Sequence, residues 1–325
     1  MAKEYRWATL GCGVIGNELA QAMQKLGRNL YSVGNRTYSK AVEFAEKYKI
    51  EKVYNDPNEM FEDENVDIIY ISTPHNLHIN SLLKALNSGK HVLCEKSITL
   101  NSSELDLAVE AAEKNNVVLA EAMTIYHMPI YKKLNEIIAS GALGDFKLIQ
   151  INFGSYKEYN MNNRFFNKNL AGGALLDIGV YALSLVRWFM SETPDQIVSQ
   201  VKYAPTGVDE QAGILLMNSR QEMATVTLSL HAKQPKRATI VFDKGYIEVY
   251  EYPRAFKAAV TYTDDGHTEI IESGNMADAL CYEVQDMEEA VSGKENIMFL
   301  DYTIDVMNIM TSIRNQWGMK YPEEM

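Results

Sequence analysis

Lys96, Asp177 and Tyr181 are the residues of this chain whose types and positions are best suited to carry chemistry. Lys96 follows His91–Cys94, a short β-rich run that is typical of a strand in a parallel sheet. A partly desolvated lysine at such a strand end could position a substrate hydroxyl and tune a neighbouring acid. The alternative is a surface lysine whose aliphatic stem packs on apolar side chains while its ammonium stays in water.

Asp177 is the only charged residue before Arg187 in an apolar helix that we expect from Ala174 onward. A helix that is apolar nearly all round is buried, and an unpaired buried carboxylate costs several kcal/mol or takes up a proton. Asp177 must therefore face a partner or a wet pocket. Tyr181 lies four residues later on the same helix face, so the pair after Gly172-Gly173 predicts a floor beneath a substrate. Alternatively, Asp177 fixes a neighbouring loop and Tyr181 packs in the core.

A Gly-x-Gly-x-x-Gly turn lies between an apolar strand-like run and a helical pattern near the start of the chain. In a dinucleotide site, the first glycine permits the tight turn, the second lets the backbone approach a pyrophosphate, and the third lets helix and strand pack closely. The phosphates would lie against the free N–H groups and positive dipole of the helix start. The predicted cofactor-binding residues of this turn are Gly11, Cys12, Gly13, Val14, Ile15 and Gly16.

The residues that follow the second predicted strand, Asn35, Arg36 and Thr37, bear on which dinucleotide binds. NAD-selective folds usually place an acid about 20 residues beyond the glycines to accept from the ribose 2′-hydroxyl. Here Arg36 occupies that region, and a guanidinium suits a 2′-phosphate that a carboxylate would repel. The sequence therefore favours NADP(H), with NAD possible. The alternative is a solvated surface arginine.

Other predicted cofactor contacts follow later strands, because ligands of open parallel sheets lie beyond the carboxyl ends of the strands. His75 and His78 near a helix start raise the question of a metal, but nothing nearby completes a ligand set, so we expect none. For His78, contact near the nicotinamide and a structural role remain equally open. The residues assigned to the cofactor here are Ser72, Thr73, Pro74, His75, His78, Glu95 and Lys96.

Two kinds of hydrophobic pattern divide the chain. From residue 5 to about 121, short β-rich runs alternate with helical stretches, which predicts a doubly wound parallel sheet, the α/β Rossmann class. From Gln196 to Ile271, period-two alternation with turn signals predicts a large, mostly antiparallel sheet in an α+β domain. We therefore expect a dinucleotide-binding domain over 1–123 and a substrate-binding and oligomerisation domain over 124–325.

Composition narrows the class of protein. The 325 residues carry a formal charge of −12, which disfavours nonspecific binding to nucleic acid or to anionic membrane. The cysteines Cys12, Cys94 and Cys281 are far apart and odd in number, as expected of reduced thiols in the cytoplasm. The first residues lack an apolar signal core, and we expect no apolar run to approach the ~20 residues of a membrane span.

The chain resembles the Gfo/Idh/MocA family over essentially its full length. Beyond the glycine turn, the matching stretches are Thr73–His78, Cys94-Glu95-Lys96, and the run from Gly172 through Asp177 to Tyr181. The tyrosine makes the last stretch most similar to the branch of dimeric dihydrodiol dehydrogenase and glucose-fructose oxidoreductase. One residue departs from the family pattern: Ser97 stands where the family carries proline after Glu-Lys. Proline restricts the backbone conformation of the residue before it, so its replacement by serine leaves the direction of the Lys96 side chain less constrained.

The resemblance implies an NAD(P)-dependent oxidoreductase acting on a sugar, polyol or related alcohol, with Lys96, Asp177 and Tyr181 around the reacting carbon. Under this hypothesis Tyr181 is the general acid/base, and the Lys96 ammonium favours its phenolate, since a free phenol titrates near pH 10. Asp177 would hold a second substrate hydroxyl or orient Lys96. The family also suggests a homo-dimer or homo-tetramer formed through the C-terminal sheet. A catalytically silent NAD(P)-binding regulator of the same fold is the alternative function.

Overall fold

The computed structural model describes residues 4–325 and folds them into two compact units. Unit 1 comprises the chain up to Ala122 together with Asp278–Leu300, and unit 2 comprises Met123–Ala277 together with Asp301–Met325. The sequence predicted a contiguous division at residue 123. In the structure, the later segment Asp278–Leu300 also belongs to unit 1.

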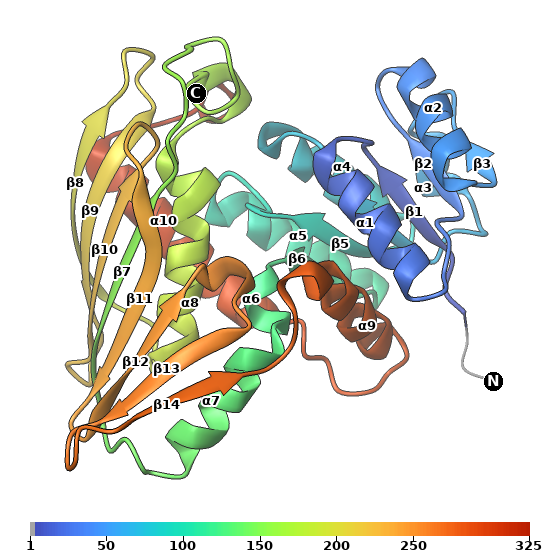
Figure 1. Ribbon diagram of the computed structural model, residues 1–325. Coiled ribbons are helices and arrows are strands. Elements are labelled where there is room, and N and C mark those ends of the chain that lie inside the picture. The colour runs from blue at the N-terminus through green and yellow to red at the C-terminus, as the bar shows by residue number, and fades with distance from the viewer. Residues whose placement is uncertain (1–3) are drawn as a thin grey trace. The chain divides into compact units, whose positions relative to one another are not determined.

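Unit 1 is built on a six-stranded parallel sheet in the order β3-β2-β1-β4-β5-β6 (Figure 1). This is the strand order of a dinucleotide-binding doubly wound sheet, and the order reverses between β1 and β4. The central strands are buried on both faces, as expected for a parallel sheet covered by helices. The strands are β1 (Trp7–Leu10), β2 (Ser32–Gly34), β3 (Lys52–Val53), β4 (Ile68–Ile71), β5 (His91–Glu95) and β6 (Leu119–Ala122).

The helices of unit 1 include one that is remote in sequence. Helix α9 packs against α1, where Trp7 Nε1 donates to Glu288 Oε1 at 3.1 Å and Arg28 pairs with Glu288 at 2.6 Å. Lys25 also pairs with Asp278 at the start of α9. These contacts explain why Asp278–Leu300 belongs to this unit. The helices are α1 (Val14–Lys25), α2 (Tyr38–Tyr48), α3 (Glu59–Glu62), η1 (His75–Leu77), α4 (His78–Asn87), α5 (Ser102–Asn115) and α9 (Ala279–Val291).

Unit 2 is built on an eight-stranded sheet in the order β14-β13-β12-β11-β7-β10-β9-β8 (Figure 1). All neighbouring strands run antiparallel except β7 and β10, which are parallel. The strands are β7 (Phe146–Gly154), β8 (Gln196–Tyr203), β9 (Asp209–Met217), β10 (Met223–Ser229), β11 (Gln234–Phe242), β12 (Gly245–Tyr250), β13 (Lys257–Tyr262) and β14 (Thr268–Glu272).

One face of this sheet is the core of unit 2. Alternate residues of its strands are buried, among them Ile151 and Val226, and helix α8 packs against β7 and β10. Helix α8 continues a single π-helical turn, η3. The helices of unit 2 are α6 (Thr124–His127), α7 (Pro129–Ala139), η2 (Lys168–Leu170), η3 (Leu175–Gly179), α8 (Val180–Phe189), η4 (Tyr252–Arg254), α10 (Leu300–Trp317) and η6 (Pro322–Glu324), and η5 (Met276–Asp278) ends where unit 1 resumes.

The opposite face of the sheet carries solvent-exposed apolar residues. Val198 is 65% exposed and stands opposite Leu215, which is also exposed, in the β8–β9 pairing. At the other end of the sheet, Ile270 is 53% exposed and stands opposite Ala259. This alternation of buried and exposed residues is the pattern from which the antiparallel sheet was predicted.

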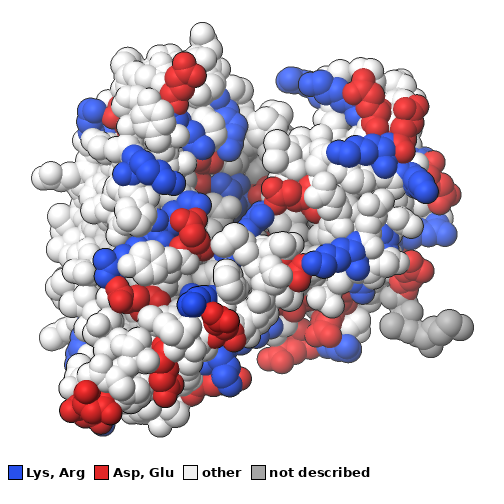
Figure 2. Space-filling model, viewed as in Figure 1, with Lys and Arg blue, Asp and Glu red and all other residues white. Residues whose placement is uncertain are grey.

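The segment Lys168–Phe189 is long and apolar enough to cross a membrane by length and composition. This corrects the expectation that no stretch approaches the length of a span. However, 83% of its most apolar window is buried inside the protein, which is the pattern of a core helix. On the face seen in Figure 2, acidic and basic side chains are interspersed rather than gathered into a broad field of one sign.

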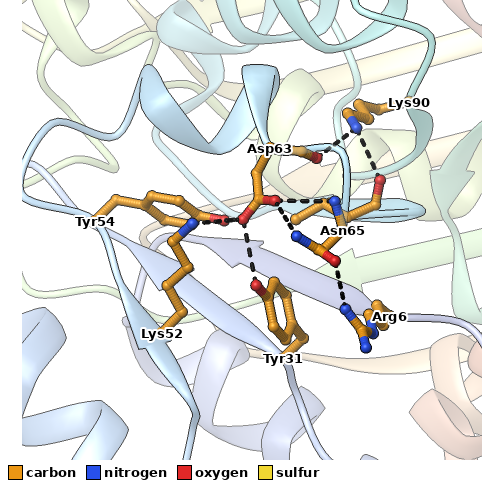
Figure 3. Close-up of polar contacts among 8 residues, drawn as sticks. Arg6, Tyr31, Lys52, Tyr54, Asp63, Asn65 and Lys90 are labelled. Carbon is orange, nitrogen blue, oxygen red and sulfur yellow. Dashed lines mark hydrogen bonds and ion pairs between the residues drawn. The ribbon is translucent and has the colours of Figure 1, made fainter.

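Asp63 is the centre of a polar cluster in unit 1 (Figure 3). Its Oδ2 accepts from Tyr54 at 2.6 Å and from Lys52 at 2.8 Å, and its Oδ1 accepts from the Asn65 N–H at 2.9 Å. The buried Lys90 ammonium donates to the Asp63 carbonyl at 2.6 Å. These bonds join the segment before β4 to Lys52 in β3, to Tyr54 directly after β3 and to Lys90 directly before β5.

We expect Asp63→Asn to lower the free energy of unfolding by about 1–3 kcal/mol near neutral pH. Burial raises the pKa of Asp63, but the hydrogen bonds from Lys52, Tyr54 and Asn65 outweigh burial and hold this pKa below its usual range. A carboxyl whose folded pKa is depressed stabilises the fold above the unfolded pKa, about 3.9, and loses that contribution as the pH falls through the folded value. Unfolding curves at pH 3 to 7 should therefore show the variant and parent converging toward acid. A difference that is constant with pH would contradict this account.

Candidate active site

The glycine turn after β1 is tight at Gly11 and closely packed at Gly16. Gly11 adopts φ +111°, and a Cβ there would lie 2.6 Å from Ser72 Oγ. A Cβ at Gly16 would lie 2.9 Å from the Gly11 carbonyl oxygen, so helix and turn are in close contact. A Cβ at Gly13 would meet no atom of residues 4–325 within 4 Å. The turn is therefore closed toward the protein and open on the side where a ligand would approach.

The start of α1 fits the pyrophosphate of a dinucleotide. The residue that begins α1, Gly13, has no side chain to cap the helix, and no acid occupies the first turn. Val14 beside the turn is 82% exposed, an apolar surface that a bound cofactor could cover. The free N–H groups and the helix dipole would hold the phosphates there.

Arg36 lies two residues beyond β2, and its exposed side chain forms no hydrogen bond or ion pair with residues 4–325. Asn35 Nδ2 donates to the Thr37 carbonyl at 3.0 Å and so shapes this loop. Lys40 was not predicted as a site residue, yet its ammonium lies close enough to Cys12 to lower the pKa of that thiol against the larger raising effect of burial. A second cation near the glycine turn adds to the positive potential that Arg36 provides. The one signal in the sequence for Lys40 is that it lies four residues after Arg36.

The segment after β4 forms part of the same edge. Ser72 N donates to the Leu10 carbonyl at 2.9 Å, beside Gly11. The Thr73 hydroxyl oxygen is buried and has no hydrogen-bond partner within residues 4–325, which suits a ligand or a water molecule. His78 is fully buried, with Nε2 2.7 Å from the Thr73 carbonyl and Nδ1 3.0 Å from the Ser97 carbonyl. Of its two open roles, these contacts favour the structural one. Pro74 is exposed, and the His75 ring lies 5.7 Å from that of His78.

Lys96 follows β5 and is half-buried between two anchored neighbours. Tyr70 donates to Glu95, and Lys96 N donates to Glu95 Oε2 at 3.3 Å. On the other side, Glu121 accepts from the Ile98 N–H at 3.0 Å. The Lys96–Ser97 peptide bond is cis. The chain is thus tied to β4 through Glu95 just before the lysine and to β6 through Ile98 two residues after it.

Asp177 lies in the π-helical turn η3, which interrupts the helix predicted from Ala174. Single π-turns inside helices are rare and often occur at functional sites. Its N–H donates to the Gly173 carbonyl at 3.3 Å, and its side chain is largely buried. Tyr181 follows in α8, half-buried, with its ring 6.2 Å from that of Phe153.

Arg164 is a partner of Asp177 that was not predicted from the sequence. Its Nη1 lies 3.3 Å from Asp177 Oδ1, and its guanidinium stacks 4.3 Å from the Phe165 ring centroid. The Arg164 side chain remains 58% exposed. It therefore meets the requirement that a buried acid needs a partner, while offering the rest of its guanidinium to solvent or substrate. The polar loop Glu158–Asn169 gave no periodic signal that could have located it.

Lys96 belongs to unit 1, whereas Asp177 and Tyr181 belong to unit 2. The structure brings Asp177 and Tyr181 together on one helix. Their meeting with Lys96 stays a prediction.

In the described part of the chain, one group of side chains could offer three metal ligands: Asp264, Asp265 and His267. All three are exposed in the β13–β14 hairpin, where His267 Nδ1 lies 2.5 Å from Asp265 Oδ1 and the His267 ring stacks on Tyr262. Hydrogen bonds within the hairpin, such as that from the His267 N–H to Asp265, explain why these side chains lie close together. This group lies outside the residues assigned to catalysis or cofactor.

Two family profiles match the chain. Residues 5–123 match the oxidoreductase family with an NAD-binding Rossmann fold, and residues 131–248 match the GFO/IDH/MocA C-terminal domain.

Curated relatives extend over almost the whole chain. Trans-1,2-dihydrobenzene-1,2-diol dehydrogenase of Xenopus laevis is 30% identical over 329 residues, covering 98% of this chain and 99% of the relative. The protein of the same name from Homo sapiens is 31% identical over 248 residues, covering 75% and 74% of the two chains.

Solved structures agree with the fold. A 3-ketoreductase from Actinomadura kijaniata in complex with NADP and TDP-benzene superposes with a TM-score of 0.86 at 19% identity, covering 96% of this chain and 98% of that one. A levoglucosan dehydrogenase in complex with NADH and levoglucosan gives a TM-score of 0.88 at 17% identity, covering 97% and 98%. From its strand order, its glycine turn and these full-length relatives, the chain belongs to the Gfo/Idh/MocA family of NAD(P)-binding oxidoreductases.

Proposed function

We propose that this oxidoreductase prefers NADP(H) and interconverts the carbinol and carbonyl forms of a sugar, polyol or dihydrodiol-like substrate. The observation that carries the proposal is the buried Asp177 on a π-turn, with Tyr181 one turn later and Arg164 at its side. A dehydrogenase of dihydrodiols is the named activity of relatives that match 98% of the chain. In this proposal, 1–123 supplies the dinucleotide site and 124–325 the substrate site.

The nicotinamide, when bound, supplies the two-electron chemistry, and the protein supplies position and charge. Tyr181 would take the proton of the substrate hydroxyl in the oxidative direction and return it in the reductive direction. Lys96 would act on the same hydroxyl region, where its positive charge makes a phenol more acidic. Asp177, oriented by Arg164, would hold a second hydroxyl or orient Lys96.

The preference for NADP(H) is proposed on the side chains near the glycine turn. Arg36 and Lys40 are cationic, and the loop Asn35–Thr37 contains no acid that would repel a 2′-phosphate. The remaining predicted cofactor contacts, from Ser72 to His75 and at Glu95, lie after strands β4 and β5. His78 would hold the backbone of Thr73 and Ser97 in place rather than contact the cofactor itself.

The test is consumption of NADPH or reduction of NADP⁺ with a panel of sugars, dicarbonyls and trans-dihydrodiols. Turnover of at least one compound that is lost in Tyr181→Phe supports the proposal. Tight NADPH binding with no turnover across the panel would instead indicate the alternative, a regulator that senses the dinucleotide.

We further propose that the protein assembles as a homo-dimer or homo-tetramer through the open face of the eight-stranded sheet. Val198 and Leu215 stand opposite each other there with exposed apolar side chains, and contiguous exposed apolar surface commonly marks an interaction site. Leu215→Asp should lower the mass measured by light scattering, whereas Leu107→Asp on the exposed side of α5 should leave it unchanged. Equal masses for parent and Leu215→Asp would exclude this face.

A further inference from the structure

The Gly172-Gly173 turn that precedes the Asp177 helix is packed tightly on both sides within unit 2. A Cβ at Gly172 would lie 2.7 Å from the Arg164 carbonyl oxygen, and one at Gly173 would collide with Asp209 Oδ1. Gly173 also adopts φ +133°, a conformation that other residues rarely reach. The position of the Gly172-Gly173 turn is therefore fixed by its contacts with Arg164 and Asp209.

Asp209 holds the turn from the start of β9. Its side chain is fully buried, and Oδ2 accepts from the Leu175 N–H, in the first turn of the helix, at 2.6 Å. Oδ1 has no hydrogen-bond partner among residues 4–325. Burial raises the pKa of Asp209 to about 7, although the Leu175 N–H and the charge of Arg314 oppose the shift. A buried acid with unused acceptors lowers stability, and such costs concentrate where function requires a particular geometry.

Tyr321 holds the turn from the C-terminal segment. Its buried hydroxyl donates to the Gly172 carbonyl at 2.8 Å. Arg314 of α10 pairs with both oxygens of Glu324, at 2.6 and 2.7 Å, and Glu324 also accepts from the Tyr321 N–H at 2.8 Å. The Arg314 guanidinium lies 4.8 Å from the Tyr321 ring centroid. A bidentate ion pair thus fixes the segment that presents the hydroxyl.

We propose that Asp209 and Tyr321 are positioning residues that set where Asp177 and Tyr181 stand, with the Arg314–Glu324 pair holding Tyr321 in place. Both contact the backbone at the start of the helix, and a shift there moves every later residue of the helix with it. Displacements near 1 Å at a reacting group can cost up to about 10² in rate. This inference rests on the proposed roles of Asp177 and Tyr181.

The experiment compares Tyr321→Phe with Tyr131→Phe. The Tyr131 hydroxyl is equally buried and donates to the Tyr252 carbonyl at 2.5 Å, but it does not contact the glycine turn. We expect Tyr321→Phe to lower kcat about tenfold with a substrate identified in the panel, while the Kd of NADPH stays unchanged. We also expect its pH profile of kcat/KM to shift, because under the proposed function Tyr181 must stay close to the positive charge of Lys96. Tyr131→Phe should lose similar thermal stability and keep both kcat and the profile.

A second pair of variants guards against a folding defect. Asp209→Ala removes the acceptor for the Leu175 N–H and should lower kcat, whereas Asp209→Asn keeps an oxygen acceptor and should restore most of it. If Tyr181→Phe abolishes turnover while Tyr321→Phe and Asp209→Ala behave like Tyr131→Phe, the positioning role is wrong and the proposed function stands. If Tyr181→Phe is itself fully active, the proposed function is wrong, and this inference fails with it.

Discussion

Tyr181→Phe should lower kcat by about 10² or more while NADP(H) still binds. The change removes one hydroxyl from a half-buried ring that packs beside Phe153, so the helix and its neighbours need not move. Under the proposed function the lost step is the transfer of the substrate hydroxyl proton, and Asp177 is the one carboxylic acid of η3 and α8. The dinucleotide site lies in the other unit and keeps its residues.

Steady-state kinetics in both directions and fluorescence titration of NADPH measure this result. Tyr203→Phe is a matched control, because the Tyr203 hydroxyl donates to the Trp317 carbonyl at 2.7 Å, away from Asp177. Unchanged turnover in Tyr181→Phe would remove this tyrosine from the proton path. A loss of NADPH binding together with activity would show a wider disturbance than the loss of one proton donor.

Arg36→Glu should raise the KM for NADPH by about 10–10² and leave the KM for NADH unchanged or lower. A charged hydrogen bond contributes about 1.5–3 kcal/mol, and an acid at this position also repels the 2′-phosphate while accepting from a 2′-hydroxyl. The side chain is exposed two residues beyond β2, so the substitution leaves the buried strands of the sheet intact.

The charge change needs its own control. Arg220→Glu makes the same substitution at an exposed arginine between β9 and β10 in unit 2 and should leave both KM values unchanged. If Arg36→Glu alters neither cofactor, Arg36 is the solvated surface residue of the alternative interpretation. The loop would then not set the cofactor preference.

Local patterns predicted most of the fold. The helix Ser102–Asn115 begins and ends as expected, because Asn101 accepts from the Glu104 N–H and so marks its start. Both sheets were predicted. Continuous apolar runs indicate the parallel strands, which are buried on both faces, and period-two alternation indicates the antiparallel strands, which are buried on one face. The short helices α3 and α6 were not predicted, because one turn is too short to show a period.

Long-range contacts could not be predicted. The docking of α9 on α1 depends on contacts such as that between Trp7 and Glu288, 281 residues apart. The Arg164–Asp177 pair joins an aperiodic loop to a helix, and the π-turn adds no residue type that a helical pattern would flag. The candidate site was thus predicted as residues after strands and on one helix, while the groups that orient them were not.

The return of α9 to unit 1 has a consequence for synthesis of the chain on the ribosome. The first unit cannot be finished when Ala122 emerges, because its last segment, which contains α9, ends at Leu300, some 180 residues later. At roughly 5–20 residues per second, the partner face of α1 waits on the order of 10 to 35 seconds without its cover. During that interval unit 2 is made as an insertion within an incomplete neighbour, so a nascent chain stalled before Leu300 should be prone to capture by chaperones and to cleavage near α1.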